Sequence, residues 1–514
     1  MKTNVLRKIL RFLAPALTIA SLIVLTSAPL FARPGGGHGF SGGRGFSGGR
    51  GFSGGYRGGG YRGGYSGAGF VYTGDSDTDY LITIAAFILV SIIIYPIMSD
   101  REKRREKIYN EIFEVAPTEE NLKGDRDLIN SQLEKLQRDD PEFSKPVFLD
   151  YASMLYNKFL LSNGDDRMQK EIRPFFADSA RPKNKHKYSE ITLGSVEIKQ
   201  ISFKNDRCNI QVAFSANYTC KNSVNGKTFR YCTEELWIFS RKNGVLSPKP
   251  NGFGILRCPN CGGALDFSDC GVCRHCGTEI NFQAGQWTVT KIMVNTLEKT
   301  YAEDMLNYAE EQGTNYPTVF ADNLKNREAE FVKAHQEDYK KFGDFENKVA
   351  KPYFMKIYES WSEGAWENSR HLLSERLWNN FDLYQKQYKE YGLFNRLKNV
   401  AITKTVTANY ETDNNYESLT VRIYAKCLDY IEDENGNVIA GDAQKTRHFS
   451  EYWTFVANKN AKFRHGDLSH CPSCGAPVEK IGNSGICEYC NCKITDGNFS
   501  WVLFSITQDE VYNG

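Results

Sequence analysis

The C-terminal part of this 514-residue chain repeats itself, and the repetition limits the folds that it can adopt. The matched residues lie 206 to 216 positions apart: Lys145-Pro146-Val147-Phe148 with Lys351-Pro352-Tyr353-Phe354, Trp237 with Trp453, Cys258 with Cys471, Cys276 with Cys490, and Trp287 with Trp501. Self-similarity at a nearly constant spacing over about 150 residues indicates tandem copies of one structural unit.

Each copy begins with a predicted helix and continues with predicted strands. Apolar residues recur at helical spacing from Phe148 to Phe159 and from Phe354 to Ala365, and Pro146 and Pro352 suit a first helical turn. Alternating stretches follow: SVEIKQISF, CNIQVAFSANY, ELWIFSR and WTVTKIMV in the first copy, and NVAITKTVTANY, SLTVRIYAKCLDY, EYWTFVAN and SWVLFSIT in the second. Helices followed by an antiparallel meander predict an α+β fold, with a curved sheet packed on helices in each copy.

Two apolar runs precede the repeats. Residues 1–32 have a basic head, an apolar stretch and Ala32 at a cleavage position, which is typical of a signal peptide; an uncleaved anchor is the alternative. The run from Leu81 to Met98 has no charge over about 18 residues, which predicts a transmembrane helix at residues 80–98. Basic residues between Arg101 and Lys107 mark its far end as cytoplasmic. We therefore expect a single-pass protein of the inner (cytoplasmic) membrane with its C-terminal domains in the cytoplasm.

Between the two runs lies a Gly/Arg-rich segment, residues 33–74, which repeats Gly-Phe-Ser-Gly-Gly-Arg. It contains too little apolar area to offset its chain entropy, so we expect disorder. Such segments can bind RNA by stacking and phosphate contacts, but outside a membrane a flexible basic tether is the favoured interpretation.

Eight of the fourteen cysteines form paired Cys-x-x-Cys sets, one set in each copy. Thiols stay reduced in a cytoplasm, and two such pairs separated by a short spacer are typical of a tetrahedral zinc ribbon. The predicted ligands of two structural zinc ions are Cys258, Cys261, Cys273, Cys276, Cys471, Cys474, Cys487 and Cys490. Disulfides and a rubredoxin-like iron site are the alternatives.

In the first cysteine set, two assignments of the third metal ligand are possible. Cys270 could replace Cys273 by a shift, although Cys273 with Cys276 matches Cys487 with Cys490. Cys492 and His275 are not expected to be ligands. Each ribbon lies between two predicted strands, as an insertion at a hairpin tip, and we expect the paired tryptophans to pack where ribbon and domain meet.

These patterns divide the chain into segments: a signal peptide 1–32, a Gly/Arg-rich segment 33–74, a transmembrane helix 80–98, a charged helical linker 99–140, a first domain 141–296 with its ribbon at 256–282, a helical linker 297–343, and a second domain 344–510 with its ribbon at 469–496.

The order of helices and strands resembles the Tim44-like family. The likeness is best in FENKVAKPYFMKIYESWSEGAWENSRHLLSERLWNNF and GLFNRLKNVAITKTVTANY, and the N-terminal layout is similar to that of bacterial membrane-anchored members. The resemblance implies two tandem cone-like domains of the nuclear-transport-factor-2 type. Mitochondrial relatives tether an import-motor chaperone and contact anionic lipid, but this chain differs in having two copies with metal inserts.

No catalytic motif is present: the sequence contains no phosphate loop, nucleophile elbow or zincin helix. We therefore expect a non-enzymatic adaptor for protein partners, with a role in membrane-protein transport or assembly and with anionic lipid nearby. The alternatives are a nucleic-acid-binding ribbon protein, against which the lack of a basic stripe argues, and a cone pocket that binds a small ligand or catalyses a reaction.

Overall fold

The fold was analysed in a computed structural model of the chain. It describes residues 34, 126–182, 184–247, 249–250, 287–300, 313–335, 343–461, 469–477, 481, 485–509, 511–512 and 514. The predicted signal peptide, the Gly/Arg-rich segment apart from Pro34, and the predicted transmembrane helix lie outside these residues. Among the helices that are described, none is long and apolar enough to cross a membrane.

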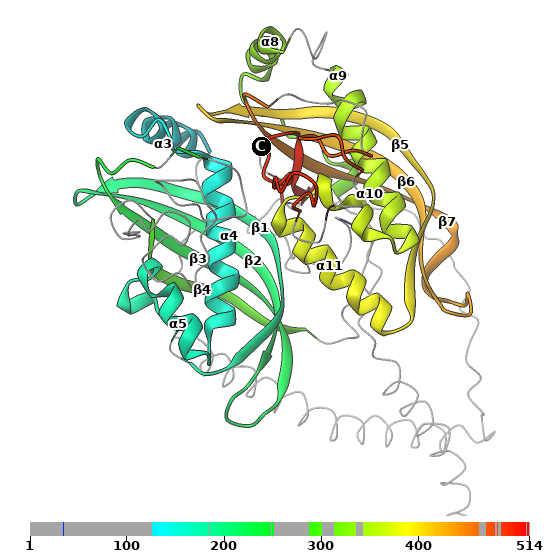
Figure 1. The fold of residues 1–514 in the computed structure, drawn as a ribbon, viewed down its shortest axis with the longest axis horizontal. Coiled ribbons are helices and arrows are strands. Elements are labelled where there is room, and N and C mark those ends of the chain that lie inside the picture. The colour runs from blue at the N-terminus through cyan, green and yellow to red at the C-terminus, as the bar shows by residue number, and fades with distance from the viewer. Residues whose placement is uncertain are drawn as a thin grey trace, which may run out of the picture. The chain divides into compact units, whose positions relative to one another are not determined.

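The first half of the described chain, Arg126–Thr300, places helices before a four-stranded antiparallel sheet (Figure 1). Its strands follow one another in the order β1-β2-β3-β4, so the predicted meander is confirmed. Its elements are α3 (Arg126–Asp139), α4 (Lys145–Ser162), α5 (Asp166–Ile172), the short 3-10 turns η2 (Arg173–Phe175) and η3 (Asp178–Ala180), β1 (Lys187–Lys204), β2 (Arg207–Lys221), β3 (Thr228–Lys242) and β4 (Thr288–Thr300).

The second half, which begins at residue 313, repeats this plan with a sheet in the order β5-β6-β7-β8. An α+β fold with two antiparallel sheets is therefore confirmed. Its elements are η4 (Gly313–Asn315), α8 (Leu324–Ala334), α9 (Gly343–Phe345), the π-helical turn η5 (Glu346–Ala350), α10 (Lys351–Glu363), η6 (Trp366–Leu372), α11 (Glu375–Glu390), β5 (Leu393–Thr412), β6 (Tyr416–Asp433), β7 (Val438–Asn458) and β8 (Val502–Gln508).

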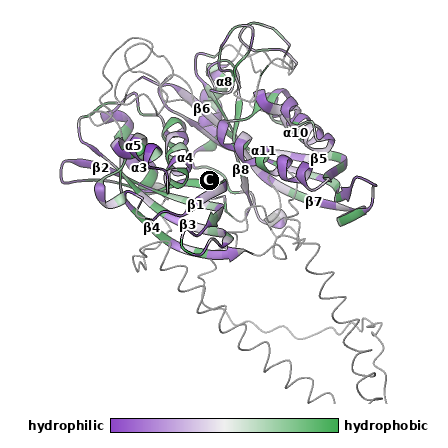
Figure 2. Cartoon of the chain, turned by 60° about the horizontal axis from the view of Figure 1, so that its bottom comes forward, coloured by the Kyte–Doolittle hydropathy of each residue, from purple (hydrophilic) through white to green (hydrophobic). Residues whose placement is uncertain are grey.

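The strands form where side chains of alternating polarity allow one sheet face to be buried. In β2, Ile210, Val212 and Phe214 are buried and the residues between them are partly exposed. This spacing of two places all three side chains on one face. Figure 2 shows hydrophobic and hydrophilic residues mixed along the strands of both sheets, as expected for sheets with one covered face.

Helices α4 and α10 correspond to each other, but at a spacing that differs from that of the Lys-Pro motifs. The hydroxyl of Tyr151 in α4 donates to the carbonyl oxygen of Trp287 at 2.7 Å. Tyr353 in α10 donates in the same way to Trp501 at 2.8 Å. Tyr353 lies 202 positions after Tyr151, whereas the Lys-Pro motifs are 206 apart. The predicted alignment of the two helices is therefore displaced by about one turn of 3.6 residues.

The reason for this displacement is where each helix begins. Pro146 lies in the first turn of α4, where its missing N–H costs nothing. In the second half α9 and the π-helical turn η5 come first, so Pro352 follows helical residues and not a loop. A proline inside a helix removes one of the regular hydrogen bonds, and a single π turn ends two residues before Pro352 here.

The paired tryptophans that are described lie in the domain cores. Trp237 is fully buried against Tyr156 and Phe159, and Trp453 and Trp501 belong to the core of the second half. The first predicted ribbon lies outside the described residues.

Side-chain hydrogen bonds join the two halves. The amide of Asn380 in α11 accepts from the Leu193 N–H at 3.1 Å and donates to the Leu193 carbonyl at 2.6 Å. The β1–β2 register shifts between Leu193 and Val196, and the amide satisfies both backbone groups at that irregularity. Lys145 and Glu411 form a second link at 2.9 Å.

Candidate metal centre

The predicted second ribbon lies between β7 and β8, which pair with each other as neighbouring strands. An insertion at this point leaves the β7–β8 ladder intact, as predicted from the sequence. Small bridges hold the ribbon together, between His470 and Pro477, between Ile481 and Cys487, and between Ile486 and Lys493. Within residues 469–477, 481 and 485–499, these bridges and short turns are the secondary structure that is described, and the cysteines lie in the turns.

Two similar turns present the cysteines in pairs. In the first, the N–H of Gly475 donates to the Cys471 carbonyl at 2.8 Å; in the second, the N–H of Asn491 donates to the Cys487 carbonyl at 2.8 Å. Both donor residues have positive φ angles, 79° and 56°. Glycine adopts this conformation without steric cost, and asparagine tolerates it better than most residues.

The four sulfur atoms converge on one point. All four Sγ atoms of Cys471, Cys474, Cys487 and Cys490 lie within 4.8 Å of one another. The Cys471–Cys490 and Cys474–Cys487 separations are 3.9 Å and 3.8 Å. A zinc ion with Zn–S bonds of about 2.3 Å has tetrahedral S···S edges of about 3.8 Å, whereas a disulfide needs about 2.05 Å. The thiols are therefore spaced as ligands of one metal ion and not as disulfide partners.

The surroundings of these thiols affect their ionisation in opposite directions. Burial raises the pKa of Cys471 to about 12. Burial also opposes ionisation of Cys490, but hydrogen bonds from the Cys492 backbone N–H and from neighbouring side chains lower its pKa to about 6. Metals bind thiolates, so binding of an ion by this group is coupled to the release of thiol protons.

Apolar side chains form a small core around the thiols. Ile481 and Ile494 are buried together with Cys471 and Cys487, and Phe499 packs against this cluster. Cys492 packs beside it, and its sulfur is not one of the four that converge. His470 is exposed and contacts Ser469, so it is also outside the group.

An ion-paired contact fixes the ribbon to its domain, which the sequence did not reveal. Lys493 Nζ lies 3.0 Å from a carboxylate oxygen of Glu375, the first residue of α11. Arg370 donates to the same oxygen at 2.6 Å and is almost completely buried. At Gly485 a side chain would meet Thr495 and Arg370, so the ribbon approaches the domain closely there. No sequence pattern links Glu375 to Lys493, which lie 118 positions apart.

The arrangement indicates a structural metal site. Four cysteine ligands complete a tetrahedron and leave no position for substrate or water. Of the eight predicted ligands, the structure brings the second four together. The first four, Cys258, Cys261, Cys273 and Cys276, lie outside the described residues, as do Cys270 and His275.

A buried carboxyl group in the first half was also missed by sequence reasoning. Glu235 accepts hydrogen bonds from Tyr156 Oη and Trp237 Nε1, both at 2.8 Å. Burial raises its pKa to about 7, against these hydrogen bonds. Its only sequence signal was its position two residues before Trp237, which Glu451 and Trp453 repeat.

The Tim44-like domain family matches residues 324–463 of this chain. The match runs from the start of α8 to just beyond β7 and stops before the ribbon cysteines. No curated protein matches the chain.

Proposed function

We propose that this chain is a non-enzymatic, membrane-anchored adaptor, with two zinc ions and two ribbon-bearing Tim44-like domains that it presents to protein partners. The match at residues 324–463 supports one such domain directly. The repeated hydrogen bonds of Tyr151 and Tyr353 support a second domain of the same kind. Membrane anchoring rests on the two apolar runs of the sequence.

The observation that carries the proposal is a closed metal site on an anchored ribbon with an exposed aromatic residue. Tyr489 lies between two of the cysteines and is 62% exposed, and Ile486 beside them is 36% exposed. Exposed aromatic and aliphatic side chains on a rigid support are typical anchors of protein interfaces. The contact among Lys493, Glu375 and Arg370 provides that support.

A photo-crosslinking amino acid at position 489 of the full chain tests the proposal in cells. We expect protein adducts that disappear when Cys474→Ser removes a metal ligand. The matched control carries the crosslinker at Asp442, which is exposed on β7, and should not yield these adducts. Adducts with RNA, or the same adducts from both positions, would contradict an adaptor that uses its ribbon.

A further inference from the structure

The first strand of the first sheet is irregular at the point where α11 of the second half contacts it. The side-chain amide of Asn380 accepts from the Leu193 N–H at 3.1 Å and donates to the Leu193 carbonyl at 2.6 Å. Leu193 lies where the β1–β2 register shifts, and β1 is an edge strand of its sheet. The outer backbone groups of an edge strand have no strand to pair with, so a helix that satisfies them covers the edge.

Three side chains on one face of α11 form this contact. Asn380, Tyr384 and Gln387 follow one another after four and three residues, which places them on the same side of a helix. Gln387 donates to a carboxylate oxygen of Glu190 at 3.1 Å. Burial raises the pKa of Tyr384, against a hydrogen bond with Thr192. The first half therefore binds a helix at its irregular edge strand.

The second sheet repeats this irregular edge strand, with each residue of β5 lying 209 positions after its counterpart in β1. Register shifts follow Ser189, Leu193 and Ile198 in β1, and they follow Lys398, Ile402 and Thr407 in β5. Glu190 and Asn399 have the same spacing and have positive φ angles of 51° and 54°. A positive φ is uncommon outside glycine, so both copies keep one unusual local backbone. Ile402 is the counterpart of Leu193.

The repeated segment is accessible in the second half. Four of its residues are exposed: Lys398, Asn399, Thr403 and Lys404. The apolar residues between them are half-buried: Val400, Ala401 and Ile402. In the first half the contact with α11 leaves Thr192 and Leu193 only 0% and 2% exposed. The same irregular backbone is thus buried beneath a helix in one half and open to a partner in the other.

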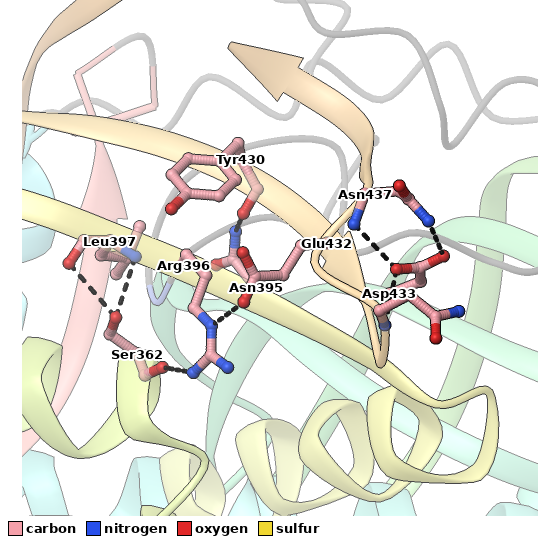
Figure 3. Close-up of polar contacts among 9 residues, drawn as sticks. Ser362, Asn395, Arg396, Leu397, Tyr430, Glu432, Asp433 and Asn437 are labelled. Atoms are coloured by element: carbon pink, nitrogen blue, oxygen red, sulfur yellow. Dashed lines mark hydrogen bonds and ion pairs between the residues drawn. The ribbon is translucent and has the colours of Figure 1, made fainter. Parts of the chain in front are cut away.

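Side chains cap the edge of β5 on both sides of this segment (Figure 3). The hydroxyl of Ser362 in α10 accepts from the Leu397 N–H at 2.9 Å and donates to the Leu397 carbonyl at 3.2 Å. Glu346 accepts from the Thr407 N–H at 3.0 Å. Ile402 lies midway between these two residues, and among the described residues no side chain is bonded to its backbone. This is the position that Asn380 fills in the first half.

The two copies of the segment differ in charge. Exposed lysines stand at three positions of the second copy, Lys398, Lys404 and Lys426, and their counterparts in the first are Ser189, Ser195 and Asn217. Lys426 belongs to β6 and pairs with Ala401 of the segment. Asn399 stands where the first copy has the acidic Glu190. Three added cations and one lost carboxylate favour a partner with negative charge, because complementary charge steers and aligns a complex.

We propose that residues 398–404 of β5, together with Lys426, form an edge site that binds an acidic helix of a partner protein. The helix binds as α11 binds β1. An amide side chain bonds both backbone groups of Ile402, an aromatic residue lies four positions later, and a carboxylate in the place of Gln387 pairs with the lysines. The edge site belongs to the second sheet and not to the ribbon, so it adds a second partner surface to the proposed adaptor.

A synthetic helical peptide tests the edge site by fluorescence anisotropy with the full chain. The peptide repeats residues 374–391 with Gln387→Glu, and alanine replaces the side chains that face the domain core, Leu377, Trp378 and Phe381. We expect saturable binding. Asn380→Ala in the peptide should weaken binding about thirtyfold, because two hydrogen bonds of about 1 kcal/mol each are lost. Lys398→Glu in the chain should weaken it about tenfold by charge repulsion.

The matched control is Lys227→Glu, which makes the same charge change in an exposed loop of the first half and should leave binding unchanged. No binding, or binding that neither Lys398→Glu nor the Asn380→Ala peptide weakens, would overturn the proposal. A dimer of the full chain that Lys398→Glu dissociates in sedimentation would assign the edge site to a second copy instead. Crosslinking from position 489 does not involve the edge site, so this proposal and the ribbon proposal fail separately.

Discussion

The two halves share a buried carboxylate beside a buried tryptophan, but the second half also contacts a residue that is distant in sequence. In the first half Glu235 accepts hydrogen bonds from Tyr156 and Trp237. In the second half Glu451 accepts from Trp453 at 3.0 Å, and the hydroxyl of Tyr358 donates to the Pro34 carbonyl. The glutamate–tryptophan contact is therefore common to both sheets, whereas the contact with Pro34 belongs to the second.

The largest expected effect concerns the metal sites, and it tests whether the halves are alike. Because structural zinc contributes about 10–16 kcal/mol in small metal-dependent domains, Cys474→Ser should abolish one site. We expect two zinc ions per purified chain and one in this variant, as measured by elemental analysis. Cys492→Ser should keep both, because Cys492 is outside the group of four. One ion in the unmodified chain would show that the first ribbon is not equivalent to the second.

The two hydrophobic cores should lose similar amounts of stability when their buried tryptophan is removed, and each loss should be confined to its own half. Trp237→Ala and Trp453→Ala each remove a fully buried side chain, and each should cost about 3–5 kcal/mol. Hydrogen exchange would show lost protection mainly in β1–β4 for the first variant and in β5–β8 for the second. Tyr391→Ala, at a residue that is 47% exposed, serves as the control. Equal loss in both sheets from either variant would mean that the halves unfold as one unit.

The buried carboxyl should make the first half sensitive to pH. Burial raises the folded pKa of Glu235 from 4.5 to about 7, so the folded state binds its proton more tightly than the unfolded state. Stability should therefore fall as pH rises from about 4.5 to about 7, by up to about 3 kcal/mol. Urea unfolding at pH 5 and pH 7.5 measures this dependence. Glu235→Gln keeps a hydrogen-bond acceptor and should flatten it; an unchanged slope would assign it to other groups.

The smallest effect concerns ribbon anchorage. Lys493→Ala removes one of two cations from Glu375 while Arg370 remains, so we expect a cost of about 1 kcal/mol. Metal transfer to a chelator should then be about fivefold faster. Lys386→Ala removes the same charge from an exposed pair with Asp382 on α11 and should have no effect. Identical rates in the two variants would mean that the ribbon is held without Lys493.

The strands were predictable because the alternation of buried and exposed side chains is visible in each strand's own sequence. Ile210 and Val212 alternate with Asn209 and Gln211, and that spacing appears in the sequence whatever the strand pairs with. The helix alignment was not predictable from the Lys-Pro motifs. It depends on which residues contact Trp287 and Trp501, and those contacts form only when helix and sheet pack.

In the metal site, too, the local features were predictable from sequence and the long-range contacts were not. Their spacing alone grouped Cys471, Cys474, Cys487 and Cys490, because a short turn allows two thiols to reach one ion. Nothing local indicated that Lys493 would reach Glu375, or that Asn380 would complete an irregular ladder in the other half. Those pairs are brought together by the path of the chain between them.

By itself the sequence determined the α+β plan and the grouping of Cys471, Cys474, Cys487 and Cys490, because these follow from periodicity and from spacing over a few residues. The tertiary structure alone decided which tyrosine meets which acceptor, where the tryptophans pack and how the ribbon is anchored. Contacts between residues that are far apart in sequence depend on how whole helices and strands pack. The local sequence around either residue does not predict them.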